Sequence, residues 1–302
     1  MDLRQIRYFL AVAAEGSFSR AANTLHMTQP PLSLAIGQLE KELGVRLLDR
    51  HPHGVSCTEA GAFLVTQGTQ LLKRTRRIED QLRDMGNGTA GQLQLAAVPS
   101  FSWSYLTPLL NRFSLEAPGS VVELSDPTPQ EALNQLAAGT IDIAIVATGN
   151  AKALQGAYEN ELSVTPLQEM PLVAALPPSF RDAPDPIDMS SLMGETWLLP
   201  QLYPRFPGLP ELVNEAWTKL GRHPSRIRTV STLQTAIPLI AAGMGIGVMP
   251  DSVSQMAGSH LVVRRFVQPI TPLQGCLVSS LRHARSPAVQ KFIDMALGGA
   301  RP

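Results

Sequence analysis

The chain contains only two cysteines, Cys57 and Cys276, which lie far apart in its 302 residues. Two cysteines exclude a disulfide-stapled scaffold in a chain of this length, and their separation does not match the spacing of a metal site. The simplest interpretation is a pair of ordinary thiols in a reducing compartment. The alternative is a redox-switch pair, although no CxxC motif supports it. We therefore expect no metal and no cofactor.

Long apolar runs are also missing from the sequence. No segment approaches the roughly 18 apolar residues that a membrane-spanning helix needs. The first ten residues, MDLRQIRYFL, carry charges where a secretion signal has its apolar core. The sequence therefore predicts a cytoplasmic protein that has no membrane partner.

Neither sign of charge is in excess. Lysine and arginine total 25, as do aspartate and glutamate, and hydrophobic residues make up 44% of the chain. This composition is typical of globular proteins, and the length fits about two domains. Zero net charge does not exclude a nucleic-acid binder, which needs only a local basic face. Residues 1–58 hold six basic and five acidic residues, so charge by itself does not indicate DNA.

The motifs of common enzyme classes are absent as well. The sequence has no P-loop, no GxSxG elbow, no HExxH helix and no set of paired metal ligands. Gly243, Gly245 and Gly247 begin like a nucleotide-binding loop, but they lack the final spacing of GxGxxG and precede a strand rather than a helix. We therefore expect that this protein is not an enzyme. A solute-binding protein for transport is a second alternative, which the C-terminal part alone would permit.

The N-terminal segment begins with two short helical patterns. Apolar residues recur at three- and four-residue steps over residues 3–13, which predicts one apolar helical face. Gly16 is placed to end this helix. Ser17 then has the position of an N-cap for a second helix, whose apolar face includes Phe18 and Leu25.

A third helix and a hairpin follow. Thr28 is placed to cap the helix, with Pro30 and Pro31 in its first turn, where proline is tolerated because those N–H groups have no intrahelical partner. Residues 45–48 and 54–58 predict two short strands joined by a turn. Three helices followed by a small hairpin are typical of a winged helix-turn-helix.

A long helical pattern without proline covers residues 59–85. Leu64, Leu71, Ile78 and Met85 lie seven residues apart within it. This spacing is typical of a coiled-coil seam and indicates a dimerisation helix. The alternative is a helix that packs on its own domain.

After a glycine-containing linker at residues 87–91, apolar strands alternate with amphipathic helices. This order is typical of an α/β domain with largely parallel sheets, and the remaining length is enough for two lobes. The expected helices cover residues 106–113, 130–138, 209–220 and 232–242. The expected strands cover residues 93–98, 121–124, 141–146, 172–176, 197–200, 227–230 and 245–250.

Residues 9–50 carry a long ordered series of spaced motifs. They contain F-x-x-V-A-x-x-G-S-F-S-x-A-A-x-x-L, then T-Q-P-x-L-S-x-x-I-x-x-L-E, then L-G-x-x-L-x-x-R, and residues 54–61 read GVSCTEAG. The series strongly resembles the DNA-binding domain of LysR-type transcriptional regulators. GTIDIAIV at 139–146 and IAAGMGIGVMP at 240–250 resemble the effector domain of the same family.

The resemblance implies a mixed fold in three parts. These are a winged helix-turn-helix DNA-binding domain at 1–58, a linker and dimerisation helix at 59–88, and a two-lobed α/β effector-binding domain at 89–302, which resembles type 2 periplasmic binding proteins. Within the last part we expect lobe I at about 91–163 and 268–298, and lobe II at about 164–267.

The resemblance also implies the function and the partners. It predicts a sequence-specific transcriptional regulator that binds double-stranded promoter or operator DNA as a homo-oligomer, either a dimer or a tetramer. RNA polymerase is a further expected partner, and a small-molecule effector is expected to alter the DNA-bound oligomer.

In such a protein the third helix enters the major groove with its first turns at the base edges. Gln29 is placed to pair with adenine, and Ser33 is a tolerant donor or acceptor. Pro30 and Pro31 are placed against thymine methyl groups. The family often has arginine or another polar residue after the serine, whereas this chain has Leu34, which leaves few hydrogen bonds for guanine.

Other residues of this domain are expected near the DNA backbone. Arg20 lies in the second helix, and Thr28 opens the third. Arg50, His51 and His53 surround the wing, where they are placed to contact phosphate or the minor groove. Protonation of these histidines would make DNA binding depend on pH.

Ligands of two-lobed α/β domains lie at the carboxyl ends of the strands. Hydroxyl groups and helix N-termini at these ends suit a carboxylate, and aromatic side chains suit an apolar body. We therefore expect a small organic acid, aliphatic or aromatic. Each hydroxyl has an alternative role as a helix cap. The expected effector-binding residues are Ser100, Phe101, Ser102, Thr128, Pro200, Gln201, Tyr203, Phe206 and Thr232.

Overall fold

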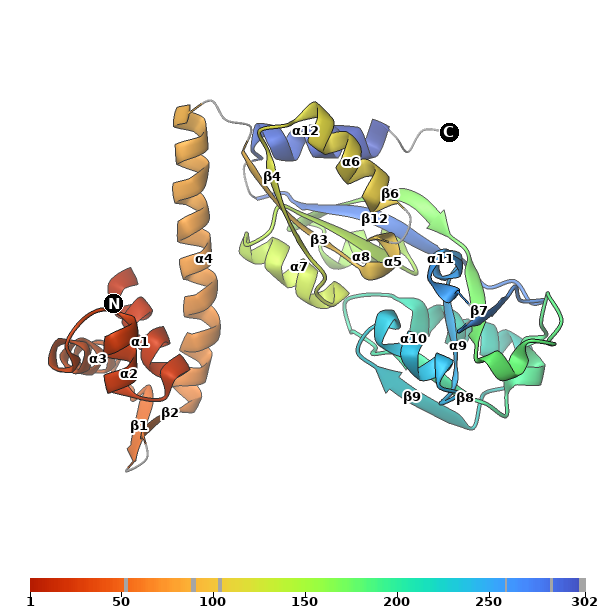
Figure 1. Cartoon of the computed structure of the whole chain (residues 1–302), viewed down its shortest axis with the longest axis horizontal. Coiled ribbons are helices and arrows are strands. Elements are labelled where there is room, and N and C mark those ends of the chain that lie inside the picture. The colour runs from red at the N-terminus through yellow and green to blue at the C-terminus, as the bar shows by residue number, and fades with distance from the viewer. Residues whose placement is uncertain (52–53, 88–90, 103–104, 259, 283–284, 299–302) are drawn as a thin grey trace. The chain divides into compact units, whose positions relative to one another are not determined.

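The computed structural model divides into two compact units, Met1–Arg83 and Asp84–Pro302 (Figure 1). Within the part of the chain that it describes, no helix combines the length and the apolar character needed to cross a membrane. The described residues are 1–51, 54–87, 91–102, 105–258, 260–282 and 285–298.

The first unit is the expected winged helix-turn-helix followed by a long helix. Its three short helices pack around a core in which Phe9, Leu32 and Ile36 are fully buried. A short antiparallel hairpin follows the third helix and forms the wing. The elements are α1 (Leu3–Glu15), α2 (Phe18–Thr24), α3 (Gln29–Leu43), β1 (Leu48–His51), β2 (Gly54–Cys57) and α4 (Glu59–Asn87).

Caps fix the ends of the helices in this unit, with one departure from expectation. Gly16 adopts a φ of 57° at the end of α1, and the Ser17 hydroxyl accepts the Arg20 N–H at 3.5 Å, as predicted. Thr28 occupies the N-cap position of α3, but its side chain makes no capping hydrogen bond. An N-cap side chain accepts an N–H from the second or third helical residue, and proline occupies both of those positions here. The predicted Thr28 cap is therefore wrong.

The first strand of the wing begins later than predicted. β1 starts at Leu48, which pairs with Cys57, rather than at Val45. The backbone of Leu47 is occupied elsewhere, since its N–H donates to the Glu40 carboxylate at 2.7 Å and its carbonyl accepts the Thr58 N–H at 3.0 Å. These bonds join the segment before the wing to α3 and to the start of α4.

The second unit contains two five-stranded sheets. The first sheet has the order β4-β3-β5-β12-β6, and we call it and its helices lobe I. It comprises β3 (Gln92–Ala97), β4 (Val121–Ser125), β5 (Ile143–Thr148), β6 (Leu162–Met170) and β12 (Leu273–Ser280). The second sheet has the order β11-β7-β10-β8-β9, and we call it and its helices lobe II. It comprises β7 (Leu172–Leu176), β8 (Thr196–Pro200), β9 (Arg226–Val230), β10 (Ile246–Pro250) and β11 (Val262–Arg264).

Both sheets are mixed, which corrects the expectation of largely parallel pairing. In lobe I, β3 pairs in parallel with β4 and β5, whereas β12 pairs antiparallel with β5 and β6. Lobe II repeats this division between parallel and antiparallel pairs. Antiparallel strands need no helical crossover between them. Among the described residues, β7 follows β6 and β12 follows β11 without an intervening helix, so the chain departs at these two points from the strand-helix alternation on which the prediction depended.

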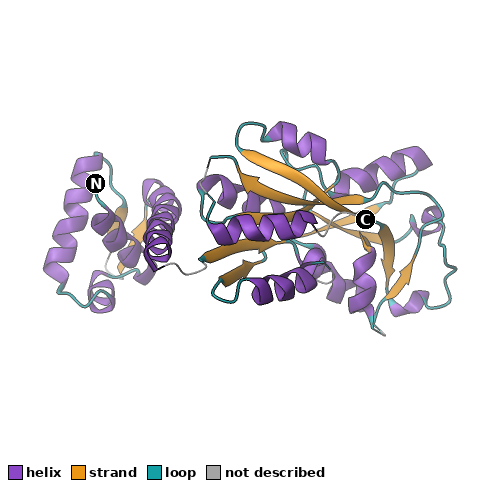
Figure 2. Ribbon diagram, turned by 90° about the horizontal axis from the view of Figure 1, so that it is seen from above, coloured by secondary structure: helices purple, strands orange, loops and turns teal. Residues whose placement is uncertain are grey.

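Helices cover the strands of the second unit (Figure 2). They are α5 (Pro99–Ser102), α6 (Leu106–Glu116), α7 (Pro129–Ala138), α8 (Ala151–Ala157), α9 (Leu209–Leu220), α10 (Leu233–Ala241), α11 (Ser254–Ala257) and α12 (Pro287–Gly298). β7 is buried along its whole length and β5 along all of its length except Ala147, which is typical of strands with helices or loops on both faces.

The chain passes from lobe I to lobe II later than the expected position near residue 163. β6 runs through that position to Met170 and pairs with β12 from Leu162 to Met170. Pro171 separates it from β7 of the second sheet. By strand pairing, the crossing therefore follows Met170.

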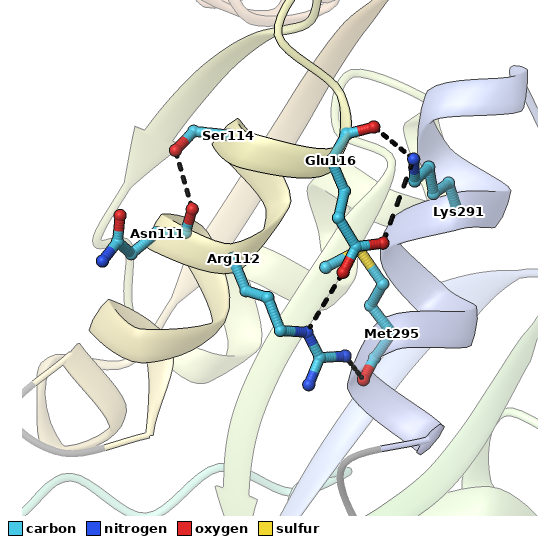
Figure 3. Close-up of polar contacts among 6 residues, drawn as sticks. All are labelled: Asn111, Arg112, Ser114, Glu116, Lys291 and Met295. Carbon is cyan, nitrogen blue, oxygen red and sulfur yellow. Dashed lines mark hydrogen bonds and ion pairs between the residues drawn. The ribbon is translucent and has the colours of Figure 1, made fainter.

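The C-terminal helix α12 is fixed to α6 by polar contacts (Figure 3). Arg112 donates to the carbonyl of Met295 at 3.0 Å, in the last turn of α12, where carbonyls have no intrahelical partner. Glu116 forms ion pairs with a basic residue of each helix. Its carboxylate lies 3.6 Å from Arg112 Nε on α6 and 4.0 Å from Lys291 Nζ on α12. These contacts hold the C-terminal helix α12 against α6 of lobe I.

Both cysteines are in surroundings that suppress thiolate formation. Burial raises the pKa of Cys276 to about 12, and partial burial also raises the pKa of Cys57. A thiol that stays protonated at neutral pH is a poor nucleophile. The environment of the two thiols therefore does not favour the redox-switch alternative.

Candidate functional site

The first turns of α3 present the residues that the sequence assigned to base contacts. Gln29, Pro30 and Pro31 are exposed, and Ser33 is half-buried. Leu34, one turn after Pro30, is 72% exposed. The opposite face of the helix carries the buried Leu32, Ile36 and Leu39, so core packing fixes which side of α3 faces outward.

Arg50 joins the wing to α3. It lies on β1, and its guanidinium donates to the Ser33 hydroxyl at 3.4 Å. The same group lies 4.7 Å from the centre of the Phe18 ring, a cation–π distance. The structure thus brings together Arg50 and Ser33, two residues that the sequence placed near DNA for different reasons.

The other predicted backbone contacts are less clearly placed. Arg20 forms an ion pair with Glu15 at 3.7 Å and also donates to the Glu15 carbonyl, so a carboxylate already offsets its charge. Thr28 is exposed. His51 uses Nδ1 in a 2.8 Å contact with the Gly54 carbonyl, within the wing. His53 lies outside the described residues.

A second candidate site lies between the two lobes of the second unit. It is a cavity of about 80 Å³, and we call it the cleft cavity. Lobe I contributes Val98, Pro99, Ser100, Pro127, Pro129, Ala147 and Leu273 to its walls. Lobe II contributes Pro200, Gln201, Tyr203, Phe206, Gly208, Leu209, Pro210, Glu211, Ser231, Thr232, Leu233 and Gln234.

Four helices begin at the walls of the cleft cavity, namely α5, α7, α9 and α10. A helix N-terminus carries partial positive charge and N–H groups without intrahelical partners. Three of these starts carry proline, which has no N–H, at Pro99, Pro129 and Pro210. Only α10 begins without proline in its first turn, at Thr232 and Leu233. Of these four starts, that of α10 therefore offers the most backbone N–H groups.

The family was identified by comparison with known proteins. Residues 3–62 match the family described as bacterial regulatory helix-turn-helix protein, lysR family. Residues 86–301 match the LysR substrate binding domain. The chain belongs to the LysR family.

Individual LysR relatives agree with this result. The chain is 34% identical over 265 residues to the probable cat1 operon transcriptional activator of Acinetobacter lwoffii, an alignment that covers 85% of this chain and 82% of that protein. It is 33% identical over 303 residues to the HTH-type transcriptional regulator CatR of Pseudomonas putida, with 98% of each chain covered.

A solved structure shares the fold. The crystal structure of CbnR, a LysR family transcriptional regulator, matches with a TM-score of 0.83 and 24% identity, and the match covers 100% of both chains.

Because of the two family matches, this LysR protein is a DNA-binding transcriptional regulator with an effector-binding domain. Its relatives are named as regulators rather than as enzymes.

The cleft cavity of this LysR protein gathers six of the nine residues that the sequence assigned to effector binding. They are Ser100, Pro200, Gln201, Tyr203, Phe206 and Thr232. Two of them also have structural roles, because the Ser100 carbonyl accepts from Ser252 at 3.3 Å and the Thr232 hydroxyl caps α10. Their roles toward an effector remain predictions.

The other three assigned residues are placed differently. Phe101 is fully buried and packs edge-to-face on Tyr105 at 5.8 Å, so it is a core residue and does not line the cavity. Thr128 lies between two lining prolines, but its hydroxyl accepts the Glu131 N–H at 3.4 Å as the N-cap of α7. The side chain of Ser102 lies outside the described residues.

The sequence interpretation missed the proline-rich part of the wall. Pro99, Pro127, Pro129, Pro200 and Pro210 all line the cavity, and only Pro200 was assigned to it. A recognisable signal was present, because proline favours the first turn of a helix and so marks helix starts in a sequence. Helix starts at strand ends are the places where α/β domains bind ligands.

The electrostatics of the cleft cavity come from dipoles more than from charged side chains. Among the described residues that line it, Glu211 is the one charged residue, and its carboxylate accepts the Gly208 N–H at 2.9 Å. That bond caps α9 and orients the carboxylate toward the backbone. The start of α10 lacks a carboxylate of this kind in its first turn.

The loop after β8 of lobe II contacts lobe I at two points. The Arg205 guanidinium lies 4.1 Å from the centre of the Tyr158 ring in lobe I, and it donates to the Ala157 carbonyl. The Thr148 hydroxyl of lobe I donates to the Pro207 carbonyl at 2.6 Å. The cavity-lining residue Phe206 therefore lies between two attachment points on lobe I, and its N–H donates to the carbonyl of Tyr203 at 3.1 Å.

Proposed function

We propose that this LysR regulator reads its operator with α3 and the wing, and that the cleft cavity binds a small organic acid that alters the DNA-bound oligomer. The observation that carries the proposal is the convergence of helix starts, hydroxyl groups and aromatic side chains on one cavity between the lobes. The cavity and the reading helix lie in different units, so each half of the proposal has its own test.

The reading face of α3 supports the DNA half. Gln29 offers an amide that matches the major-groove edge of adenine, and Ser33 lies on the same side of the helix. Arg50 supports a role for the wing as well, because its hydrogen bond to Ser33 links β1 of the wing to α3. Residues that contact bases specify sequence, whereas phosphate contacts do not.

Gln29→Ala is expected to weaken binding to the selected operator by about 10- to 100-fold, the loss of one bidentate base contact. Binding to a random duplex should fall by less than about twofold, since phosphate contacts remain. Gel-shift titration of both duplexes measures the difference. Gln67→Ala on the exposed side of α4 is the matched control and should change neither affinity. Equal losses on both duplexes would contradict the role of Gln29.

The long helix α4 is packed on its own unit near its start and carries exposed apolar residues farther along. Ala60 and Leu64, near its start, pack against the core of the first unit. Farther along, Leu71, Ile78 and Leu82 are 42%, 51% and 63% exposed. We propose that this exposed seam pairs with a second copy, as a dimer or within a tetramer, so that two wings bind a palindromic operator. RNA polymerase is the further partner proposed at the promoter.

The donors at the start of α10 support an organic acid as the effector. Ser231, Thr232 and Gln234 line the cavity around the one helix start whose first turn has no proline. Oriented N–H groups and hydroxyls stabilise a carboxylate without a cationic side chain. The proline and aromatic walls suit an apolar body.

Ala147→Phe is expected to fill the cleft cavity and to abolish ligand-induced stabilisation. Thermal unfolding of the wild-type chain would be followed with benzoate, hexanoate and succinate, and with benzyl alcohol as an uncharged comparison. A ligand at about 100 times its Kd stabilises the folded state by roughly 2.7 kcal/mol, so at least one acid should raise the wild-type Tm measurably.

In the Ala147→Phe variant the same acid should no longer raise the Tm, while DNA binding without ligand is retained. Ala153→Phe on the exposed side of α8 is the control and should respond like the wild type. A full response in Ala147→Phe would place the ligand elsewhere. Silence of the wild type toward every acid would contradict the organic-acid assignment.

A further inference from the structure

The most exposed large hydrophobic side chain among the described residues of the first unit lies on the reading helix. Leu34 is 72% exposed, compared with 69% for Phe63 and 59% for Met1. It follows Pro30 by four residues, so both lie on one face of α3. Pro30 and Pro31 are exposed as well. The first two turns of α3 therefore present an apolar strip to the outside.

Gly37 continues this face one turn later. A Cβ at position 37 would meet no atom within 4 Å, and the residue does not have a positive φ. Neither sterics nor backbone conformation therefore requires glycine here. Glycine inside a helix weakens that helix relative to alanine. On the exposed face of α3, such a glycine leaves room for close approach by something outside the chain.

The acidic residues of α3 are turned away from this face or are already paired. The Glu40 carboxylate accepts the N–H groups of Leu47 and Leu48 at 2.7 and 3.1 Å. Glu42 forms an ion pair with the N-terminal amine of Met1, which lowers the pKa of its carboxyl. A helix face with no free carboxylate can approach phosphate groups without charge repulsion.

We propose that Leu34 reads the 5-methyl groups of thymine in the major groove, and that Gly37 lets the same face of α3 lie close against the DNA. The inference rests on the proposed placement of α3 in the groove. Thymine presents a methyl group at its major-groove edge, whereas cytosine presents an amino group there. An apolar side chain distinguishes the two by removing the methyl group from water.

The test uses the full-length chain and a duplex that the wild type selects from a random-sequence library. Each thymine of that duplex is replaced in turn by deoxyuridine, which removes the methyl group and changes no hydrogen-bonding group. At one or two positions in each half-site, wild-type affinity should fall by about fourfold, the value of one buried carbon.

Leu34→Ala should remove this dependence, so that thymine and deoxyuridine duplexes bind equally well. The side chain is exposed, so the variant folds like the wild type. Leu115→Ala, which changes a 75% exposed leucine of the second unit, is the matched control and should keep the fourfold difference. If the wild type binds every deoxyuridine duplex as well as the thymine duplex, or if Leu34→Ala keeps the difference, the assignment of Leu34 is overturned. In the second case a partner protein, rather than DNA, becomes the better candidate for contact with Leu34.

Gly37→Ala tests the close approach separately. Gly156 in α8 also has open space around its Cβ position and lacks a positive φ, so Gly156→Ala is a matched control. Both variants should keep or raise the Tm of the full-length chain, because alanine favours a helix. Only Gly37→Ala should weaken binding to the selected duplex, by about tenfold for a loss of roughly one good contact.

Unchanged DNA affinity in Gly37→Ala would overturn the close approach. A lower Tm would instead show that glycine serves the fold, which also contradicts the inference. Gln29→Ala separates this outcome from failure of the proposed function. If Gln29→Ala loses specificity while the methyl groups have no effect, α3 reads DNA without Leu34. If neither change affects specificity, α3 is not the reading helix.

Discussion

Gly61→Ala is expected to destabilise the first unit and to reduce DNA affinity by at least about tenfold, which corresponds to a loss of roughly 1.4 kcal/mol. A Cβ at position 61 would lie 2.1 Å from the carbonyl oxygen of Leu47. That oxygen belongs to the backbone and already accepts the Thr58 N–H at 3.0 Å, so it cannot move freely. The new methyl group must push the start of α4 away from the segment that leads into the wing.

The stability cost of Gly61→Ala should fall in the upper part of the roughly 1–3 kcal/mol range for overpacked sites. Urea unfolding followed by circular dichroism measures it. Gly68→Ala in the same helix is the graded control. There a Cβ would lie 2.9 Å from a methyl group of Ile6, a side-chain atom that yields more readily than backbone. A larger loss in Gly68→Ala than in Gly61→Ala would contradict the explanation from the Leu47 carbonyl.

Gly275→Ala is expected to destabilise lobe I by about 3 kcal/mol. A Cβ at position 275 would lie 1.9 Å from Cζ of Phe101, inside the space of the ring. Phe101 is fully buried, and Gly275 lies on β12, which is hydrogen-bonded to β5 on one side and β6 on the other. Neither the ring nor the strand has room to withdraw. A lower urea midpoint of the full-length chain would measure the effect.

Phe101→Leu provides the control for this prediction. The smaller side chain should lower stability by itself, because it leaves part of a filled core empty. Combined with Gly275→Ala, however, it should recover part of the loss, since the leucine leaves space for the new methyl group. If the two losses simply add, the ring is not what excludes a side chain at position 275. This pair also tests our correction that Phe101 is a core residue.

Local sequence signals accounted well for the ends of the helices. Gly16 and Ser17 act where they were predicted, because a left-handed residue and an N-cap need only their own neighbours. Thr28 shows the limit of the same reasoning. It has the right residue type at the right position, but the two prolines that follow have no N–H to donate to it.

The sheets were harder to predict than the helices. β5 and β7 were recognisable as buried strands, but their partners were not. β12 separates β5 from β6 in the first sheet, although it lies more than a hundred residues later in the chain. Pairing across such separations depends on the whole fold, and strand patterns carry little information about it. The expectation of largely parallel sheets failed for this reason.

The sequence alone determined the winged helix-turn-helix, the outward face of α3 and the position of several strand ends that line the cleft cavity. These features follow from periodicity and from spaced motifs, which act over a few residues. Tertiary structure decided that Arg50 reaches Ser33, that Phe101 is buried under β12, and that five prolines share one cavity. Each of these depends on residues far apart in the sequence, and only packing of the complete core brings such residues into contact.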